Sequence, residues 1–228
     1  MQKGYRHELK YYINQGDYVL LSKRLKETLK SDKHTDENGE YFIRSLYFDD
    51  MNDSAFRDKL SGLDRRDKFR IRVYNLSSNI IELECKHKDG PYIRKDSIAL
   101  TGEEYQRIMN GDYSFLLHRK EMFAKRMFAE FAIKQLKPKV LVDYMREPYV
   151  FEHQDVRITF DKDIRTAYRS VDLFNPNLPT YPVLTEGDMV LEVKYNEYLP
   201  TYIRTLLQID APLRSAISKY CLCRKMEL

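Results

Sequence analysis

Charged side chains recur at every second position along several segments of this chain, and this pattern constrains the fold more than any other. Arg and Glu dominate it, and both signs occupy neighbouring positions. A spacing of two places side chains on one face of a β-strand. The pattern therefore predicts strands with one charged face and one apolar face. It runs through six segments: Arg6/Glu8/Lys10, Lys68/Arg70/Arg72, Glu82/Glu84/Lys86, Tyr92/Arg94/Asp96, Arg157/Thr159/Asp161 and Glu192/Lys194.

The predicted elements are mostly strands, interrupted by a few helices. Alternation predicts strands at Tyr5–Ile13, Glu40–Asp49, Lys68–Asn75, Ile80–Lys88, Tyr92–Leu100, Lys139–Arg146, Tyr149–Phe151, Val156–Asp161 and Asp188–Tyr195. Helical periodicity predicts helices at Gln15–Lys30, Thr101–Asn110, Ser114–Leu136, Leu199–Gln208 and Ala211–Lys225. Short turns such as Asp89-Gly90-Pro91 join antiparallel neighbours. Because helices do not follow every strand, we expect an α+β fold with an antiparallel sheet.

The charged strand faces need an explanation, because a half-buried strand ordinarily turns its polar face to solvent. A solvated outer face is the simpler interpretation of any one segment, but its recurrence in six favours another. In a closed or nearly closed antiparallel β-barrel, helices cover the apolar outside and the charged faces line a water-filled lumen. Such a lumen focuses positive potential on whatever enters it. Polyphosphate and nucleoside triphosphates are narrow enough to fit, whereas duplex DNA is not.

Composition limits the class of protein. The 228 residues contain 39 Lys and Arg against 35 Asp and Glu, so the net charge of +4 does not indicate a nucleic-acid-coating polycation. Hydrophobic residues make up 43%, enough for a core, and no linker composition interrupts the chain, so we expect one domain over residues 1–228. Three cysteines are an odd number for a disulfide framework. With no apolar leader, they predict a cytoplasmic location.

The order and spacing of several short motifs resemble the catalytic domain of the VTC (vacuolar transporter chaperone) family, in the triphosphate tunnel metalloenzyme (CYTH-like) superfamily. The resemblance extends over nearly the whole chain. Its landmarks are RHELKYY at 6–12, SLYFD at 45–49, RDKFRIRVY at 66–74, ELECK at 82–86, PKVLVDYMR at 138–146, VRITFD at 156–161, LEVK at 191–194 and SKY at 218–220.

This resemblance implies a tunnel of about eight antiparallel strands, with a charged lumen and helices packed outside. It also implies a polyphosphate polymerase, which transfers the γ-phosphate of ATP to a growing polyphosphate chain with Mn²⁺ or Mg²⁺ as cofactor. The expected partners are ATP, inorganic polyphosphate or triphosphate, and phosphate, with no nucleic acid.

The resemblance assigns roles to individual residues. By motif, the phosphate-binding side chains are Lys10, Arg70, Arg72, Lys86, Arg146, Arg157 and Lys219, with Lys194 assisting. The charge alternation adds Arg94 to them. Within this set, we expect Arg70, Arg72, Lys86 and Lys219 to act in catalysis. Glu192 is the expected metal ligand, with Glu8 and Glu84 as further candidates.

One departure from the superfamily pattern bears on the reaction. The hydrolase branch carries an N-terminal Glu-x-Glu-x-Lys metal motif, and here Arg6 replaces its first Glu. This favours the polymerase over a tripolyphosphatase or nucleoside triphosphatase, which stays open as an alternative, as does a non-catalytic polyphosphate sensor. Nothing in these residues matches the membrane helices of eukaryotic VTC proteins. Product export would therefore need a separate membrane-protein partner, which would hold the chain at the inner face of the membrane.

Overall fold

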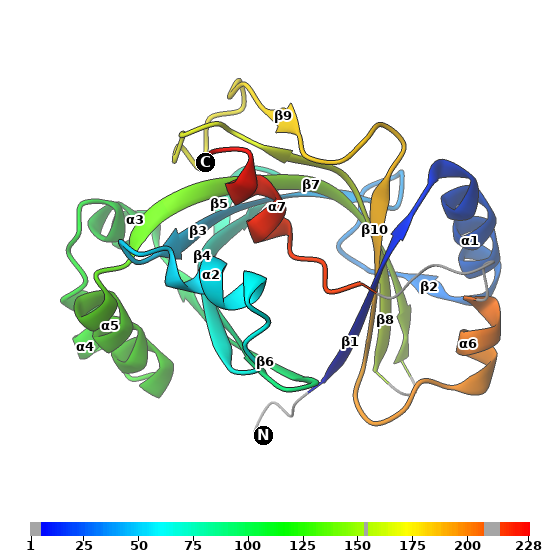
Figure 1. Cartoon of the computed structure of the whole chain (residues 1–228), viewed down its shortest axis with the longest axis horizontal. Coiled ribbons are helices and arrows are strands. Elements are labelled where there is room, and N and C mark those ends of the chain that lie inside the picture. Colours follow the sequence, from blue (N-terminus) through cyan, green and yellow to red (C-terminus); the bar gives the residue numbers. More distant parts are fainter. Residues whose placement is uncertain (1–5, 153–154, 208–214) are drawn as a thin grey trace.

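The fold is built on one large antiparallel sheet (Figure 1). The computed structural model describes residues 6–152, 155–207 and 215–228. The main path of the sheet runs in the order β1-β10-β8-β7-β3-β4-β5-β6, while β2 pairs with β7 and β9 with β8. The strands are β1 (His7–Ile13), β2 (Lys30–Ser31), β3 (Tyr41–Asp49), β4 (Arg66–Tyr74), β5 (Ser77–Asp89), β6 (Tyr92–Leu100), β7 (Lys137–Phe151), β8 (Val156–Thr166), β9 (Tyr181–Pro182) and β10 (Met189–Tyr195).

The sheet curls into a half-barrel whose two edge strands approach each other (Figure 1). Among the described residues, β1 and β6 meet at one antiparallel bridge. There Arg6 and Ile93 exchange two backbone hydrogen bonds, with N···O distances of 2.9 and 3.0 Å. The predicted antiparallel, α+β architecture with a charged concave face is confirmed.

Helices cover the convex face at both ends of the sheet (Figure 1). Beneath α3 (Gly102–Met109), α4 (Phe115–His118) and α5 (Met122–Lys134) lies an apolar core with strands β3 to β6. A second core joins α1 (Gln15–Thr28) and α6 (Thr201–Leu206) to β1, β8 and β10. Both helix groups bury the apolar strand faces, which leaves the charged faces on the concave side.

Two short helices lie on the concave side instead. α2 (Ser54–Leu60) and α7 (Lys219–Lys225) contact each other and share a third core with β3 and β7. Val140 and Val142 on β7 contribute to this core from the concave face. The concave face is therefore divided into an apolar part beneath α7 and a charged part beside it.

Most predicted elements are present, with shifted boundaries. β7 continues through Pro148, so the two strands expected at Lys139–Arg146 and Tyr149–Phe151 are one. The helix expected over Ser114–Leu136 is divided into α4 and α5. Of the helix expected over Ala211–Lys225, the described residues 215–225 contain only α7, and residues 208–214 lie outside the described part. Sequence periodicity missed α2, β2 and β9, which have at most seven residues each.

In the described ranges, no helix combines the length and the apolar character needed to cross a bilayer.

Candidate active site

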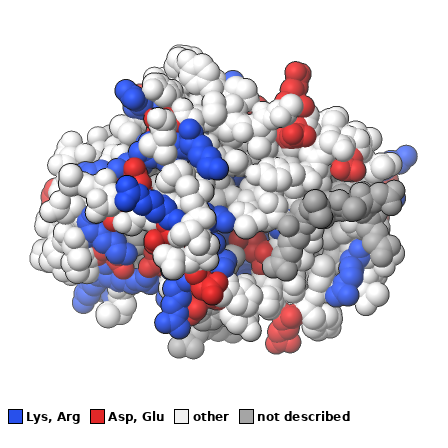
Figure 2. Space-filling model, in the orientation of Figure 1, with Lys and Arg blue, Asp and Glu red and all other residues white. Residues whose placement is uncertain are grey.

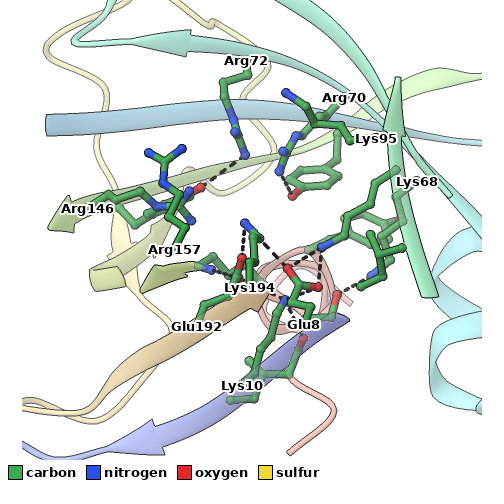
Figure 3. Close-up of a pocket in the computed structure, with 18 of the residues that line it drawn as sticks. Glu8, Lys10, Lys68, Arg70, Arg72, Lys95, Arg146, Arg157, Glu192 and Lys194 are labelled. Atoms are coloured by element: carbon green, nitrogen blue, oxygen red, sulfur yellow. Dashed lines mark hydrogen bonds and ion pairs between the residues drawn. The ribbon is translucent and has the colours of Figure 1, made fainter. Parts of the chain in front are cut away.

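A cavity of about 1130 Å³ occupies the charged part of the concave face (Figure 3). Among the described residues, 14 Lys and Arg side chains line it, against four Asp and Glu. The face shown in Figure 2 presents Lys and Arg side chains clustered over its left and central parts, with Asp and Glu between them. The nearly balanced charge of the whole chain thus hides a strongly basic cavity.

Two arginines project into the cavity from β4. Arg70 and Arg72 are two residues apart, so strand geometry turns both inward. The guanidinium of Arg70 donates to the carboxylate of Glu84 on β5 and to the hydroxyl of Tyr47, at 2.9 Å. Arg72 lies 3.8 Å from the same carboxylate and donates to the Tyr144 hydroxyl at 3.4 Å. Both guanidiniums are therefore held in extended positions with part of their donor capacity free for an anion.

Glu84 lies behind these arginines rather than in the cavity. Its side chain is buried, and the ammonium of Lys95 on β6 contacts it at 2.6 Å. Burial alone would raise the pKa of this carboxyl, but Arg70, Arg72 and Lys95 hold it well below its usual value. Glu84 is therefore ionised and fully occupied by cations, an arrangement that orients the arginines.

A second buried carboxylate performs the same task on β8. Arg146 donates two hydrogen bonds to Asp161, at 2.7 and 2.9 Å, and the ammonium of Lys219 contacts the same carboxylate. Burial opposes ionisation, but Arg146 and Lys219 lower the pKa of Asp161. Lys219 begins α7, so the position of this short helix sets where that ammonium lies.

Two carboxylates, Glu8 and Glu192, face the cavity from the neighbouring strands β1 and β10 (Figure 3). Lys86 donates to both oxygens of Glu8, at 2.7 and 2.8 Å. Lys10 lies 3.4 Å from Glu192, and Lys194 contacts Glu192 directly and Glu8 at 3.8 Å. These side chains form one network of alternating charge, in which Lys10 and Lys194 each lie between the carboxylates of Glu8 and Glu192.

The network divides the lysines by pKa. Burial lowers the pKa of Lys86 to about 8, because Glu8 offsets the desolvation only in part. For Lys10 the carboxylates of Glu8 and Glu192 outweigh burial and raise the pKa. Burial alone would raise the pKa of Glu192, but Lys194, Lys10 and Lys219 hold it well below its usual value. At neutral pH, Glu192 is therefore ionised, and Lys10 is charged beside it.

Arg157 closes another side of the cavity. One of its terminal nitrogens donates to Asp32 and to the Tyr41 hydroxyl, both at 2.8 Å. Its Nε is buried without a hydrogen-bond partner in the described part of the chain. A donor left unsatisfied in this way is costly unless a ligand accepts from it.

The carboxylates of Glu8 and Glu192 could hold a divalent cation only if a bound phosphate supplied further oxygen ligands. The described residues contain no group of three or more His, Cys, Asp or Glu side chains positioned for a metal. Glu8 and Glu192 are close enough to share Lys10 and Lys194, which supply positive charge where an ion would sit. Mg²⁺ is commonly held by one or two carboxylates plus substrate phosphates. The donor set fits that mode and not a cage made by protein alone.

The structure brings most of the predicted site residues together. Those that line the cavity are Glu8, Lys10, Arg70, Arg72, Lys86, Arg146, Arg157, Glu192, Lys194 and Lys219. Glu84 lies in the wall behind them. Whether they bind phosphate or metal stays a prediction.

The predicted orientation of Arg94 is wrong. The turn at Gly90-Pro91 pairs Asp89 with Tyr92, and this register places Lys95 beside Lys86 and Arg94 beside His87. Lys95 therefore faces the cavity, and Arg94 points to the other face, where it contacts Asp96 at 3.2 Å. Both parities of β6 carry charges, so alternation alone could not choose between them, but the pairing across the two-residue turn could have.

Sequence reasoning also missed several cavity residues. Lys59 lies on α2, which periodicity did not reveal, and Arg66 and Lys88 extend the alternating patterns of β4 and β5 by one step. Lys68 was part of a charged triplet without an assigned role. Continuing each alternation to the strand ends would have identified all but Lys59.

Comparisons with known proteins agree with this geometry. A sequence model of the VTC domain family matches residues 5–227. A search of curated proteins finds no match. Among solved structures, HpAC1 from Hippeastrum superposes with a TM-score of 0.57 at 14% identity, and the match covers 98% of this chain and 96% of that one. HpAC1 is an adenylyl cyclase-like protein, and its structure is described as revealing a dominant triphosphatase activity. A candidate adenylate cyclase from Bacillus halodurans gives 0.52 at 13% identity, covering 90% and 87%. At these identities the likeness shows the fold.

Proposed function

The chain belongs to the VTC domain family, and from that premise we propose that it is a polyphosphate polymerase. In this reaction a terminal oxygen of the polyphosphate chain attacks the γ-phosphorus of ATP. The bond between that phosphorus and the β,γ-bridging oxygen breaks, and ADP leaves with the electron pair. A single basic cavity that holds donor and acceptor phosphates together supports this proposal.

The observation that favours transfer over hydrolysis is the state of the lining carboxylates. All four lie within 4.0 Å of a Lys or Arg nitrogen: Glu8 of Lys86, Asp32 of Arg157, Glu82 of Lys95 and Glu192 of Lys10. Hydrolysis must remove a proton from water, which calls for a base. A phosphate acceptor is already anionic and needs none, so a cavity whose carboxylates are neutralised suits transfer.

In this proposal the protein acts by positioning and by charge. Phosphoryl transfer depends mainly on orientation and on stabilising the charge of the transferring group. Arg70 and Arg72 present planar forks suited to bidentate phosphate contacts, and Lys86 and Lys219 add point charges. A bound Mn²⁺ or Mg²⁺ would neutralise charge on the reacting phosphate oxygens, and Glu192 with Glu8 would hold it.

The main alternative is a triphosphatase in the same cavity. It is favoured by the description of HpAC1, which shares the fold. Free thiols at all three cysteines support the expected reducing, cytoplasmic setting, where ATP is available. A membrane-protein partner at the inner membrane face belongs to the proposal only if the product is exported.

The deciding experiment is incubation of the protein with ATP and Mn²⁺ or Mg²⁺, followed by ³¹P NMR and gel analysis of the products. Long-chain polyphosphate supports the proposal, free phosphate alone establishes the triphosphatase, and ATP binding without turnover leaves a sensor. We expect Arg72→Ala to lower turnover by about 10²- to 10³-fold, as removal of a transition-state donor does. Arg94→Ala is the matched control, because Arg94 lies on the opposite strand face.

A further inference from the structure

One hydroxyl group in the cavity wall contacts a lysine and has no part in the reaction proposed above. Ser218 lines the cavity and has only 8% of its surface exposed. The Nζ of Lys68 on β4 lies 2.6 Å from the Oγ of Ser218, and Figure 3 shows Lys68 reaching towards the side of the cavity where Lys10 lies. A serine hydroxyl within hydrogen-bonding distance of an amine is an arrangement from which a nucleophile can be made.

The hydrogen bonds of Ser218 suit a hydroxyl that gives up its proton. Its Oγ accepts from the backbone N–H of Cys221, at 3.3 Å, which leaves the hydroxyl proton free to point elsewhere. A charged Lys68 donates to the Oγ, whereas a neutral Lys68 can accept the hydroxyl proton on its lone pair. Ser–Lys pairs perform nucleophilic catalysis in this way on unrelated folds.

The surroundings of Lys68 favour its neutral form. Burial lowers the pKa of Lys68 to about 7; the Cys221 thiol opposes this shift, and Lys10, Lys86 and Arg66 add to it. These four groups face Lys68 from α7, β1, β5 and β4. A base works best when its pKa lies near the pH of the reaction. Lys68 meets this condition while the lining carboxylates are paired with cations.

The same part of the cavity would stabilise a phosphate attached to Ser218. Lys10 donates to the backbone carbonyl of Ile217, the preceding residue, at 3.3 Å, so its ammonium lies close by. Lys68, once it has taken up the proton, presents a second ammonium at the Oγ. Cations beside a phosphate ester stabilise its negative charge. Both the attack and its product are therefore favoured at this hydroxyl.

We propose that Ser218 accepts the γ-phosphate of ATP with Lys68 as its base, so that the protein phosphorylates itself in the cavity. The Oγ of Ser218 forms a bond to the γ-phosphorus as the bond from that phosphorus to the β,γ-bridging oxygen breaks. ADP leaves with the electron pair, and the hydroxyl proton passes to the Nζ of Lys68. A serine acceptor, unlike a phosphate acceptor, needs such a base.

This role rests on the proposed function only in taking ATP as the donor that binds in the cavity. It adds an acceptor that belongs to the protein. The oxygens of phosphoserine at position 218 can accept a further γ-phosphate, because they are already anionic. A polymerase with this residue would have a first acceptor when no polyphosphate is present.

The test is incubation of the 228-residue chain with Mg²⁺ and ATP labelled at the γ-phosphorus, at pH 8 and without polyphosphate. Tandem mass spectrometry locates the phosphate, and protein-bound label gives the initial rate. We expect label on Ser218 and none there in Ser218→Ala. Lys68→Arg keeps the positive charge but cannot take up a proton, so its rate should fall about 10²-fold or more.

Ser77→Ala is the matched control. Ser77 also lines the cavity, and its Oγ also accepts from a backbone N–H, that of Asn79 at 3.2 Å. Within the described residues, however, its hydroxyl has no lysine as a hydrogen-bond partner. This variant should keep the full label on Ser218. If Ser218→Ala does not fold, Ser218→Asn repeats the test, because Asn caps the start of a helix and has no hydroxyl.

The pH dependence separates a base from a merely structural lysine. Bound triphosphate favours the charged form of Lys68, so the labelling rate of the wild type should rise with pH above 7 as Lys68 releases its proton. The residual rate of Lys68→Arg should show no such rise. Wild-type protein without phosphate on Ser218, or a Lys68→Arg rate within about threefold of the wild type, overturns the proposal.

These outcomes are distinct from those of the proposed function. Long-chain polyphosphate without phosphoserine refutes the role of Ser218 and leaves the polymerase. Phosphoserine at position 218 without polymer supports the role of Ser218 and refutes the polymerase. ATP that is bound or hydrolysed with neither product refutes both.

Discussion

Two buried carboxylates, Glu84 and Asp161, hold the side chains of the cavity arginines in place. Both are fully buried, and each contacts at least two cations. Removing one partner of a buried pair leaves an uncompensated charge, which costs about 3–5 kcal/mol. Glu84 and Asp161 therefore act as built-in counter-ions for the guanidiniums that face the cavity.

The first prediction concerns Glu84→Gln. We expect the free energy of unfolding to fall by about 3–5 kcal/mol, because the amide cannot neutralise Arg70 and Lys95. Urea denaturation measures the loss. Saturating tripolyphosphate should raise the free energy of unfolding of the variant by more than it raises that of the wild type. Glu152→Gln is the control, since Glu152 pairs with Lys30 at the exposed surface and should cost far less. Similar losses in the two variants would show that Glu84 has no such role.

The second prediction concerns the charge of Lys68. Its pKa is lowered from 10.5 to about 7, chiefly by burial. Below pH 7 the ammonium is charged in both folded and unfolded states, so its full destabilising effect is present. Between pH 7 and 10.5 the folded protein releases the proton and the unfolded chain keeps it, so this residue makes stability rise with pH.

A bound polyanion favours the charged form of Lys68, so binding above pH 7 should take up a proton. Titration calorimetry of long-chain polyphosphate at pH 8, in buffers of different ionisation enthalpy, counts the protons. Lys86 also titrates in this range, with a pKa of about 8, so the informative value is the difference from Lys68→Arg. That variant stays charged and should take up fewer protons. Equal uptake by both proteins would exclude Lys68 as the source.

At the scale of elements, the carboxylate of Asp49 joins the strand β3 to the helices α2 and α7. Asp49 ends β3 and accepts hydrogen bonds from the backbone N–H groups of Ala55 and Phe56 in α2, at 3.0 and 3.1 Å. It also accepts from the Tyr220 hydroxyl in α7, at 2.5 Å. The helix start at Asp53 provides no side-chain cap of its own, so Asp49 supplies the missing acceptor. The position of Lys219 follows from this anchor, because it precedes Tyr220.

The third prediction is that Tyr220→Phe lowers the free energy of unfolding by about 1–2 kcal/mol, because it removes one donor from a buried carboxylate. For a chain of this length, each kcal/mol corresponds to a fall of about 2–4 °C in Tm. The phenyl ring keeps the stacking on Tyr47, so scanning calorimetry measures the hydrogen bond. Tyr202→Phe, at a half-exposed ring on α6, is the control. An unchanged Tm for Tyr220→Phe would mean that Asp49 does not anchor α7.

Sequence periodicity could predict the strands because their alternation is local. Arg70 and Arg72 need no tertiary contact to share a face. The short helix α2 could not be predicted in this way, since periodicity does not show that Asp49 at the end of β3 caps it, and the core beneath α7 that holds it comes from segments distant in sequence. The same is true of the pairing of Arg146 with Asp161, which depends on register between strands. Periodicity in the sequence predicts which side chains share one face of a strand, whereas the ion-pair partners of those side chains depend on how the strands are arranged in the fold.

At the scale of the whole molecule, the distribution of charge matters more than its sum. The chain carries a net charge of only +4, yet the described cavity lining has 14 basic residues and four acidic ones. Acidic side chains therefore predominate elsewhere on the protein. This separation should keep the outer surface from attracting other polyanions strongly, while the cavity attracts them.

The fourth prediction is a strong salt dependence confined to cavity ligands. The logarithm of tripolyphosphate affinity should fall with the logarithm of salt concentration, with a slope of about −0.7 for each phosphate neutralised, by analogy with single-stranded nucleic acids. Arg72→Ala should make the slope shallower, and Arg94→Ala should leave it unchanged. Calorimetric titrations between low and physiological salt provide the slopes. A slope near zero for the wild type would contradict electrostatic capture by the cavity.

The meeting of the two sheet edges has a mechanical consequence. Over the described residues, β1 and β6 are joined at the single bridge between Arg6 and Ile93, whereas every other neighbouring pair on the main path shares at least five register positions. Two hydrogen bonds are far easier to break than a whole ladder. Separating the two sheet edges at this seam would therefore cost the described part of the molecule only two backbone hydrogen bonds, so the seam between β1 and β6 is the weakest line around the curled sheet.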